Sequence, residues 1–168
     1  MATRKSTWII FGILVISAWV PGSAIQTGAH TSVLDEYTAA WNSHDTEKVV
    51  SFFTDECVYE DIGFSLTKRG KEELRAFIHG FFATFPDTNF ELKSSFISGN
   101  WYCGEWVWSG THKGNMPGLP ATGKRFSIQG VSVGELREGK IKRNTDYYNK
   151  TDLLQQIGIK PVPASPPK

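Results

Sequence analysis

Apolar residues recur at three- and four-residue steps in three stretches of the first half of the chain. This period predicts amphipathic helices over residues 32–42, 46–54 and 71–85. Asp45 is a natural N-cap for the second helix, and Pro86 ends the third because the residue before a proline avoids helical geometry. The apolar stripe of the third helix consists of Leu74, Phe77, Ile78, Phe81, Phe82 and Phe85.

After Pro86 the apolar period falls to two, which is the period of a β-strand. Together with one earlier segment, this alternation predicts strands over residues 57–62, 89–97, 101–112, 125–136 and 140–149. A short helix over residues 151–157 follows them. Because the helices precede most of the strands, the pattern predicts an α+β fold in which three helices pack on one curved antiparallel sheet.

Alternation within two of these strands places polar groups on the same face. It groups Cys57, Tyr59 and Asp61 in the first strand, and Asn144, Asp146 and Tyr148 in the last. Glycines 104, 110, 130 and 134 interrupt the other strands, where they indicate either bends or close packing of the backbone. A strongly bent sheet would leave a cavity beneath the helices.

The beginning and end of the chain have compositions unlike the rest. Arg4 and Lys5 precede an apolar run of 13 residues, and small residues follow it, as in a signal peptide that is cleaved after Ala24. The run is shorter than the roughly 20 residues of a membrane-spanning helix, so we expect an exported protein; an uncleaved N-terminal anchor is the alternative. We therefore divide the chain into a signal peptide (residues 1–24), one domain (25–160) and a proline-rich tail (161–168).

Charge, histidine spacing and cysteine content limit the classes of function that are expected. Without the expected signal peptide the chain carries 16 basic and 17 acidic residues in no long block of one sign, so nucleic acid and stable membrane insertion are not expected. The four histidines have no ligand-like spacing, so we expect no metal site. Cys57 and Cys103 could form a disulfide in an oxidising compartment, or remain free as small buried residues on neighbouring strands.

Several short motifs, taken in their order and spacing, resemble those of one protein family. They are residues 37–45 (YTAAWNSHD), 49–57 (VVSFFTDEC), 59–61 (YED), 110–114 (GTHKG), 118–124 (GLPATGK), 139–141 (GKI) and 146–148 (DYY). The chain resembles the SnoaL-like polyketide cyclases of the nuclear-transport-factor-two-like and ketosteroid isomerase-like superfamily. The resemblance implies a cone-shaped α+β barrel around a pocket, no cofactor, and homodimers that pair through the sheet. Since this fold hosts many activities, the site must be argued from its residues.

The resemblance to the cyclases implies that Asp146 is the general acid and base. A carboxylate in an apolar cavity has a raised pKa, which suits it to remove a proton from a carbon next to a carbonyl. The alternative is a structural aspartate that pairs with Arg143 or Arg125 or caps the final helix.

Tyr37 and Asp61 resemble the oxyanion-binding tyrosine and the base of ketosteroid isomerase. The isomerase's second, acidic oxyanion donor is missing, and Gln129 stands near its place. Alternatively, Tyr37 is a core residue and Asp61 a turn carboxylate. Limonene epoxide hydrolase is also similar around residues 119–124 and 146–148, but its Asp-Arg-Asp set is broken at residues 112–114.

Aromatic side chains are expected to wall the pocket and to favour a flat, apolar ligand. Trp106 and Trp108 share one face of their strand and Trp101 lies on the other. His112, near the expected mouth, could assist Asp146 or polarise a carbonyl; the alternative is a structural histidine beside a glycine-rich loop. The expected ligand-binding residues are Trp41, Tyr59, Phe81, Trp106, Trp108, Gln129 and Tyr148. The leading hypothesis is a proton-transfer enzyme acting on a hydrophobic carbonyl compound; the rivals are a non-catalytic exported binding protein and, less favoured, an epoxide hydrolase.

Overall fold

The computed structural model describes residues 32–159, so the expected signal peptide and proline-rich tail lie outside the described residues. Its helices are α1 (Val33–Asn42), α2 (Thr46–Ser51), α3 (Gly70–Thr84) and α4 (Lys150–Gln156). Its strands are β1 (Phe53–Asp61), β2 (Leu66–Arg69), β3 (Asn89–Ser98), β4 (Trp101–Thr111), β5 (Arg125–Arg137) and β6 (Lys140–Tyr148). None of these helices is long and apolar enough to cross a membrane.

Local signals fix where the first two helices begin. Ser32 caps α1 in a reciprocal capping box with Asp35, and the Asp45 side chain accepts from the backbone N–H of Lys48 at the start of α2, as expected. The second helix is shorter than the sequence predicts. It ends at Ser51 because Phe53 already pairs with Ile141 of β6.

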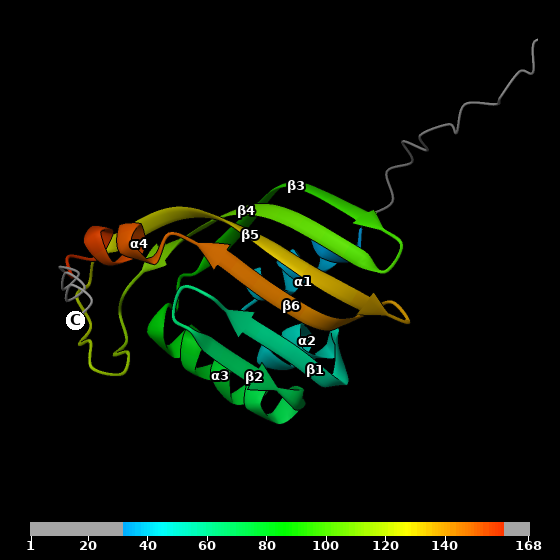
Figure 1. Ribbon diagram of the computed structural model, residues 1–168. Coiled ribbons are helices and arrows are strands. Elements are labelled where there is room, and N and C mark those ends of the chain that lie inside the picture. The colour runs from blue at the N-terminus through cyan, green and yellow to red at the C-terminus, as the bar shows by residue number, and fades with distance from the viewer. Residues whose placement is uncertain (1–31, 160–168) are drawn as a thin grey trace, which may run out of the picture. The chain divides into compact units, whose positions relative to one another are not determined.

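The six strands form one sheet in the order β2-β1-β6-β5-β4-β3, curved but not closed (Figure 1). Adjacent strands run antiparallel except β1 and β6, which pair in parallel. The expectation of a purely antiparallel sheet is therefore wrong at this one pair, and β2 was not predicted at all. The parallel pair sets Asp61 beside Asp146 in the ladder.

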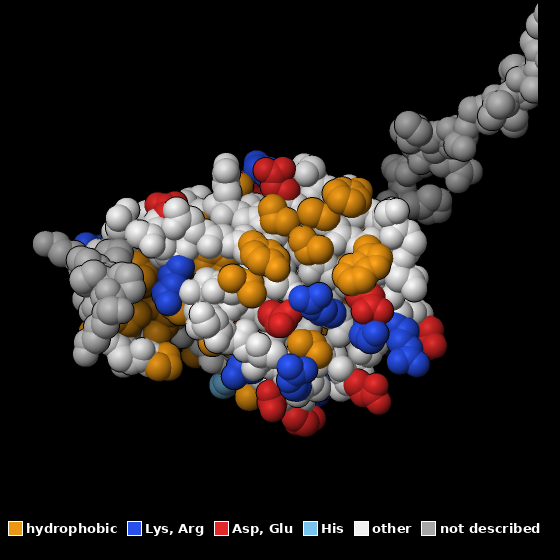
Figure 2. Space-filling model, viewed as in Figure 1, with side chains coloured by type: hydrophobic (Ala, Val, Ile, Leu, Met, Phe, Trp, Pro, Cys, Tyr) orange, Lys and Arg blue, Asp and Glu red, His pale blue; other side chains and the backbone are white. Residues whose placement is uncertain are grey.

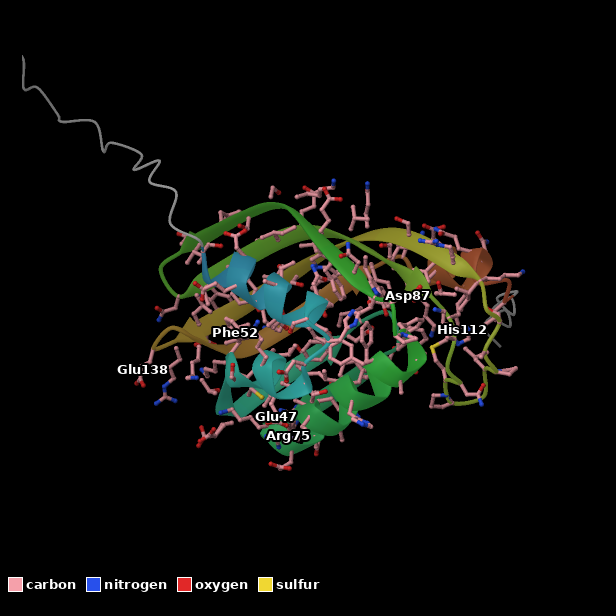
Figure 3. The ribbon with its side chains drawn as sticks, turned by 180° about the vertical axis from the view of Figure 1, so that it is seen from behind. Glu47, Phe52, Arg75, Asp87, His112 and Glu138 are labelled. Carbon is pink, nitrogen blue, oxygen red and sulfur yellow. The ribbon has the colours of Figure 1, made fainter. Side chains whose placement is uncertain are left out.

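Helices α1, α2 and α3 cover one face of the sheet (Figures 1 and 3). On the solvent side, Arg75 joins α3 to α2 by binding Glu47 at 2.5 Å. Beneath them, Trp41 of α1, Leu74 and Ile78 of α3, and Tyr59 of β1 belong to one buried cluster. The α+β fold with three N-terminal helices and a short C-terminal helix is thus confirmed.

The strand glycines serve close packing. A Cβ on Gly130 would collide with the indole of Trp106, and one on Gly134 with the ring of Tyr102. The ladder between β4 and β5 runs without a bulge through all four strand glycines. Small residues on β5 therefore let large rings from β4 lie against its backbone.

Both cysteines are free. Cys57 is buried on β1, and Cys103 is partly exposed on β4. Two strands, β6 and β5, lie between them in the sheet. The expectation of neighbouring strands is wrong, and the expectation that both remain free small residues holds.

Candidate active site

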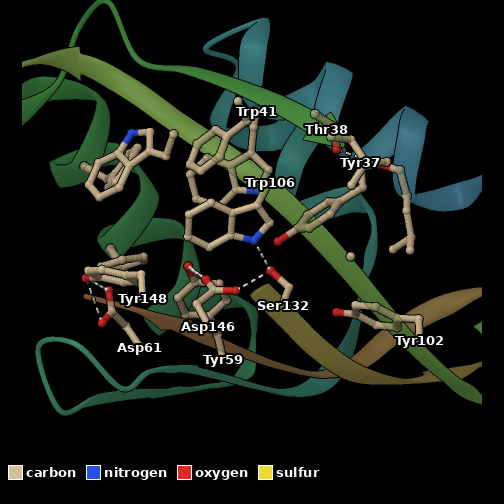
Figure 4. Close-up of a pocket in the computed structure, with 17 residues that line it drawn as sticks. Tyr37, Thr38, Trp41, Tyr59, Asp61, Tyr102, Trp106, Ser132, Asp146 and Tyr148 are labelled. Atoms are coloured by element: carbon tan, nitrogen blue, oxygen red, sulfur yellow. Dashed lines mark hydrogen bonds between the residues drawn. The ribbon is translucent and has the colours of Figure 1, made fainter. Parts of the chain in front are cut away.

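Asp146 lies in the middle of the sheet, on β6. Its neighbours in the ladder are Asp61 on β1 and Ser132 on β5. Its side chain points to the helix-covered face, where it lines an inner cavity of about 60 Å³ (Figure 4). The Asp146 side chain is partly exposed.

Three side chains donate hydrogen bonds to the Asp146 carboxylate. Oδ1 accepts from the Ser132 hydroxyl at 2.5 Å and from the Asn144 amide at 2.7 Å, and Oδ2 accepts from the Tyr59 hydroxyl at 2.5 Å. Two of these donors are themselves held by a further donor. The indole N–H of Trp106 donates to Ser132, and the hydroxyl of Tyr102 donates to Asn144.

Opposing effects set the protonation of Asp146. Removal from water raises its pKa, the bonds from Ser132, Tyr59 and Asn144 lower it, and the negative charge of Asp61 raises it again. The result is a pKa of about 6, above the ordinary value for aspartate. A group with this pKa can both take and return a proton near neutral pH.

The arrangement leaves room for a substrate at the carboxylate. A carboxylate has about four acceptor sites, and three of those of Asp146 are occupied by the donors just described. Tyr37 lines the same cavity with its hydroxyl turned toward it (Figure 4). Burial, and then the charge of Asp146, raise the pKa of Tyr37, so its hydroxyl stays protonated as a donor.

Asp61 and Tyr148 form a second polar group in the cavity wall. The Tyr148 hydroxyl lies 2.9 and 3.0 Å from the two oxygens of Asp61, and the backbone N–H of Phe64 donates to one of them at 2.8 Å. Burial raises the pKa of Asp61, while these bonds oppose the rise. Two groups therefore fix the Asp61 carboxylate: the Tyr148 hydroxyl, and the backbone N–H of Phe64 in the turn after β1.

All six aromatic residues that were expected to bind the ligand line the inner cavity. They are Trp41, Tyr59, Phe81, Trp106, Trp108 and Tyr148. The rings also pack on one another: Trp108 stacks on Phe90 with centroids 5.9 Å apart, and Phe81 lies 5.3 Å from Trp41. The aromatic interior is therefore mostly core, and the inner cavity within it is narrow.

Two expected site residues lie elsewhere. Gln129 is exposed on the opposite face of the sheet, because alternation along β5 turns Ile128 and Gly130 inward. His112 is fully buried beside Phe85 at the end of β4 (Figure 3). Its Nδ1 lies 3.2 Å from the Thr122 hydroxyl, and burial lowers its pKa. The expectations that Gln129 contacts the ligand and that His112 assists Asp146 are wrong.

The sequence did not reveal two of the three side chains that hold Asp146. Asn144 shares a face with Asp146 by simple alternation, but nothing singled it out as a donor. Ser132 is the cross-strand partner of Asp146, a relation that depends on the register between β5 and β6. Its position between Gly130 and Gly134, on the inward side of β5, is the signal that could have found it.

The alternative roles of these residues can be judged from their contacts. Arg143 binds Glu60 at 2.9 Å on the outer face, so it does not pair with Asp146. Within residues 32–159 no cluster of three histidine, cysteine or acidic side chains is arranged to hold a metal ion.

Known proteins share both sequence and fold with this chain. The family model of the SnoaL-like polyketide cyclases matches residues 31–157. Aklanonic acid methyl ester cyclase DnrD of Streptomyces peucetius is 33% identical over 61 residues, which are 36% of this chain and 42% of that protein. The match thus spans less than half the length of this curated relative.

Solved structures extend the likeness to most of the domain. TsrD from Streptomyces laurentii is 25% identical with a TM-score of 0.65, covering 75% of this chain and 92% of that one. A protein of ketosteroid isomerase-like fold from Catenulispora acidiphila, solved with trimethylamine, is 20% identical with a TM-score of 0.68, covering 80% and 97%. Because the family model spans nearly all of the described residues, this chain belongs to the SnoaL-like polyketide cyclase family.

Proposed function

We propose that this protein is a cofactor-free enzyme that moves a proton during cyclisation or isomerisation of an apolar carbonyl compound, with Asp146 as general acid and base. The observation that carries the proposal is the setting of Asp146. Its carboxylate borders a cavity, is held by three donors, and has a pKa of about 6. The likeness to DnrD, an aklanonic acid methyl ester cyclase, supports the same class of reaction.

The proposed chemistry begins with ionised Asp146. It takes a proton from the carbon next to a carbonyl, and the electrons of the broken C–H bond pass to the carbonyl oxygen, forming an enolate. The Tyr37 hydroxyl donates a hydrogen bond to that oxygen. In ring closure the enolate carbon bonds to a second carbonyl carbon of the same molecule, and the resulting alkoxide takes the proton back from Asp146. In isomerisation the proton returns to a different carbon.

Proton exchange tests this proposal without knowledge of the natural substrate. 2-Tetralone is a compact apolar ketone whose protons beside the carbonyl exchange in heavy water, which NMR follows directly. We expect the protein to accelerate this exchange, with a rate that rises with pH through about 6 as Asp146 ionises and then levels off. Asp146→Asn should slow the catalysed exchange by about 100-fold or more.

A matched control is Asp55→Asn. Asp55 is an exposed aspartate on β1, in the same sheet as Asp146, and it pairs with Lys71 at the surface. This variant should leave the exchange unchanged. If the wild type binds 2-tetralone without accelerating exchange, the non-catalytic binding protein becomes the better description. If Asp146→Asn exchanges as fast as the wild type, another residue is the base.

A further inference from the structure

The two oxygens of the Asp146 carboxylate have unequal surroundings. Within residues 32–159, Oδ1 accepts from both the Ser132 hydroxyl and the Asn144 amide, whereas Oδ2 accepts from the Tyr59 hydroxyl alone. Each oxygen of an ionised carboxylate has about two acceptor sites. The two donors therefore fill Oδ1, and the acceptor site that remains on the carboxylate belongs to Oδ2.

Both donors to Oδ1 are held by side chains of β4. The Tyr102 hydroxyl donates to the amide oxygen of Asn144 at 2.6 Å, and the indole N–H of Trp106 donates to the Ser132 hydroxyl at 2.8 Å. Tyr102 and Trp106 lie four residues apart, so alternation places them on the same face of the strand. Two relays thus run from β4 to one oxygen of Asp146, and Figure 4 shows the relay through Ser132.

Packing against β5 fixes the starting point of each relay. A Cβ on Gly134 would collide with the ring of Tyr102, and one on Gly130 with the indole of Trp106. Tyr102 is 2% exposed and Asn144 is 1% exposed, so water does not replace the bond between them. Burial also raises the pKa of Tyr102, so its hydroxyl keeps its proton and remains a donor.

The chemistry of the two rings sets the direction of the bonds that reach Asp146. An indole N–H can only donate, so Ser132 accepts from Trp106 and turns its own hydrogen toward Oδ1. The Tyr102 hydroxyl occupies the amide oxygen of Asn144, so the NH₂ group of that amide faces the carboxylate. A reversed amide would place its oxygen against the ionised carboxylate, where two acceptors repel each other.

We propose, building on the function proposed above, that Tyr102 and Trp106 are positioning residues. Acting through Asn144 and Ser132, they anchor Oδ1 of Asp146 and leave Oδ2 to take and return the substrate proton. During proton removal the substrate C–H bond breaks, an O–H bond forms on Oδ2, and the electron pair of the C–H bond passes to the carbonyl oxygen. An anchored carboxylate meets the reacting carbon in one orientation, which lowers the barrier.

Tyr102→Phe tests the relay through Asn144, because it removes one hydroxyl and keeps the ring. Carbon-13 NMR of protein labelled at the aspartate carboxyls follows the titration of Asp146, whose signal is the one missing from Asp146→Asn. We expect the variant to lower the acid dissociation constant of Asp146 about threefold, which is a rise in pKa, because the bond from Asn144 to the ionised form weakens. Tyr147→Phe removes an exposed hydroxyl on the other face of the sheet and should leave the titration unchanged.

The rate of proton exchange of 2-tetralone separates positioning from basicity. A stronger base that keeps its orientation removes protons faster, whereas a base that has lost its anchor removes them more slowly. We therefore expect the plateau rate at high pH to fall about tenfold in Tyr102→Phe, although the pKa of Asp146 rises. A plateau rate that rises with the pKa, or an unchanged pKa, overturns the proposal.

Trp106→Phe tests the relay through Ser132 by the same two measurements, with the same expected directions. Ser132→Ala, which changes a small inward residue, is the second variant if the loss of the indole prevents folding. Because Trp106 acts through Ser132, adding Trp106→Phe to Ser132→Ala should change the dissociation constant of Asp146 less than about 1.5-fold. Additive effects in the double variant contradict the relay.

The titration keeps this proposal distinct from the proposed function, because it needs no turnover. If the wild type catalyses no exchange, the proposed function fails, and the titration still decides whether Tyr102 and Trp106 act on Asp146. If the wild type catalyses exchange and neither variant changes the titration, the relays fail and the proposed function stands.

Discussion

At the scale of single residues, the candidate site is the Asp146 carboxylate. Some of its surroundings stabilise its ionised form and others stabilise its neutral form. Ser132, Asn144 and Tyr59 stabilise the ionised form of Asp146, whereas its removal from water and the nearby Asp61 disfavour it. The balance favours the neutral acid at low pH and the base above about pH 6. An ionisable group whose pKa suits proton transfer does not give the folded state its greatest stability.

This tuning predicts that Asp146→Asn stabilises the protein above pH 6. The folded-state pKa of Asp146 lies near 6 and its usual value is 3.8, so the folded state binds more protons than the unfolded state between these values. The free energy of unfolding therefore falls as pH rises through this window, by at most about 3 kcal/mol. The asparagine variant lacks this titration, so its Tm should exceed that of the wild type increasingly from pH 4 to pH 7.

Thermal unfolding monitored by circular dichroism measures the difference, and Asp55→Asn again serves as the control. A constant Tm difference across this pH range would mean that the Asp146 pKa is not raised in the folded protein.

Asp146 and Asp61 could be predicted because their motifs resemble those of known families, and alternation within each strand then showed that Tyr59 shares a face with Asp61. Sequence reasoning missed the bond from Ser132 because that contact depends on cross-strand register, which a single sequence does not show. It misplaced Gln129 because one step along β5 changes the face. The burial of His112 was not predicted, because it depends on packing against Phe85, which is far away in the sequence.

At the scale of elements, the inward-facing residues of β5 include small ones, and aromatic side chains of β4 therefore pack against its backbone. Gly130 receives the indole of Trp106, which brings its N–H within 2.8 Å of the Ser132 hydroxyl. The sequence predicted the strands that carry these residues but left open whether their glycines serve bends or close packing. It also missed β2 and the early start of β1, since β2 has four residues and little apolar alternation.

We expect Gly130→Ala to disturb the site through Trp106. The new methyl group would collide with the indole, which must then move away from Ser132. Such overpacking costs about 1–3 kcal/mol of folding free energy. Proton exchange should slow and the Trp106 emission spectrum should shift. Gly110→Ala is the strand control because its Cβ would approach the nearest atom only to 3.4 Å; equal effects of both variants would contradict this account.

At the scale of the whole molecule, the sheet face away from the helices carries exposed apolar side chains (Figure 2). They include Phe96 on β3, Trp101 on β4, Val133 on β5 and Tyr147 on β6. Trp101 is 52% exposed and Phe96 63% exposed. A patch of this kind commonly marks a protein interface.

We expect a second copy of this chain to cover that patch in a two-fold symmetric dimer. Two ion pairs on this face, Lys142 with Glu135 and Arg143 with Glu60, are formed within the chain, so these charges need no partner from the second copy. Sedimentation velocity should show a dimer, and Phe96→Lys or Trp101→Lys should yield a folded monomer. His79→Lys, on the helical side, should remain dimeric. A wild type that is monomeric at every concentration would contradict the expectation.

The parallel pairing of β1 with β6 also determines at what stage of folding the site can form. The bond between Tyr148 and Asp61 joins residues 87 positions apart, and the four strands β2, β3, β4 and β5 lie between them in the chain. Contacts of such long sequence separation form late and slow the folding of a chain. During synthesis, the edge of β1 that pairs with β6 must therefore stay unpaired until β6 has left the ribosome, and the candidate active site is among the last parts of the protein to assemble.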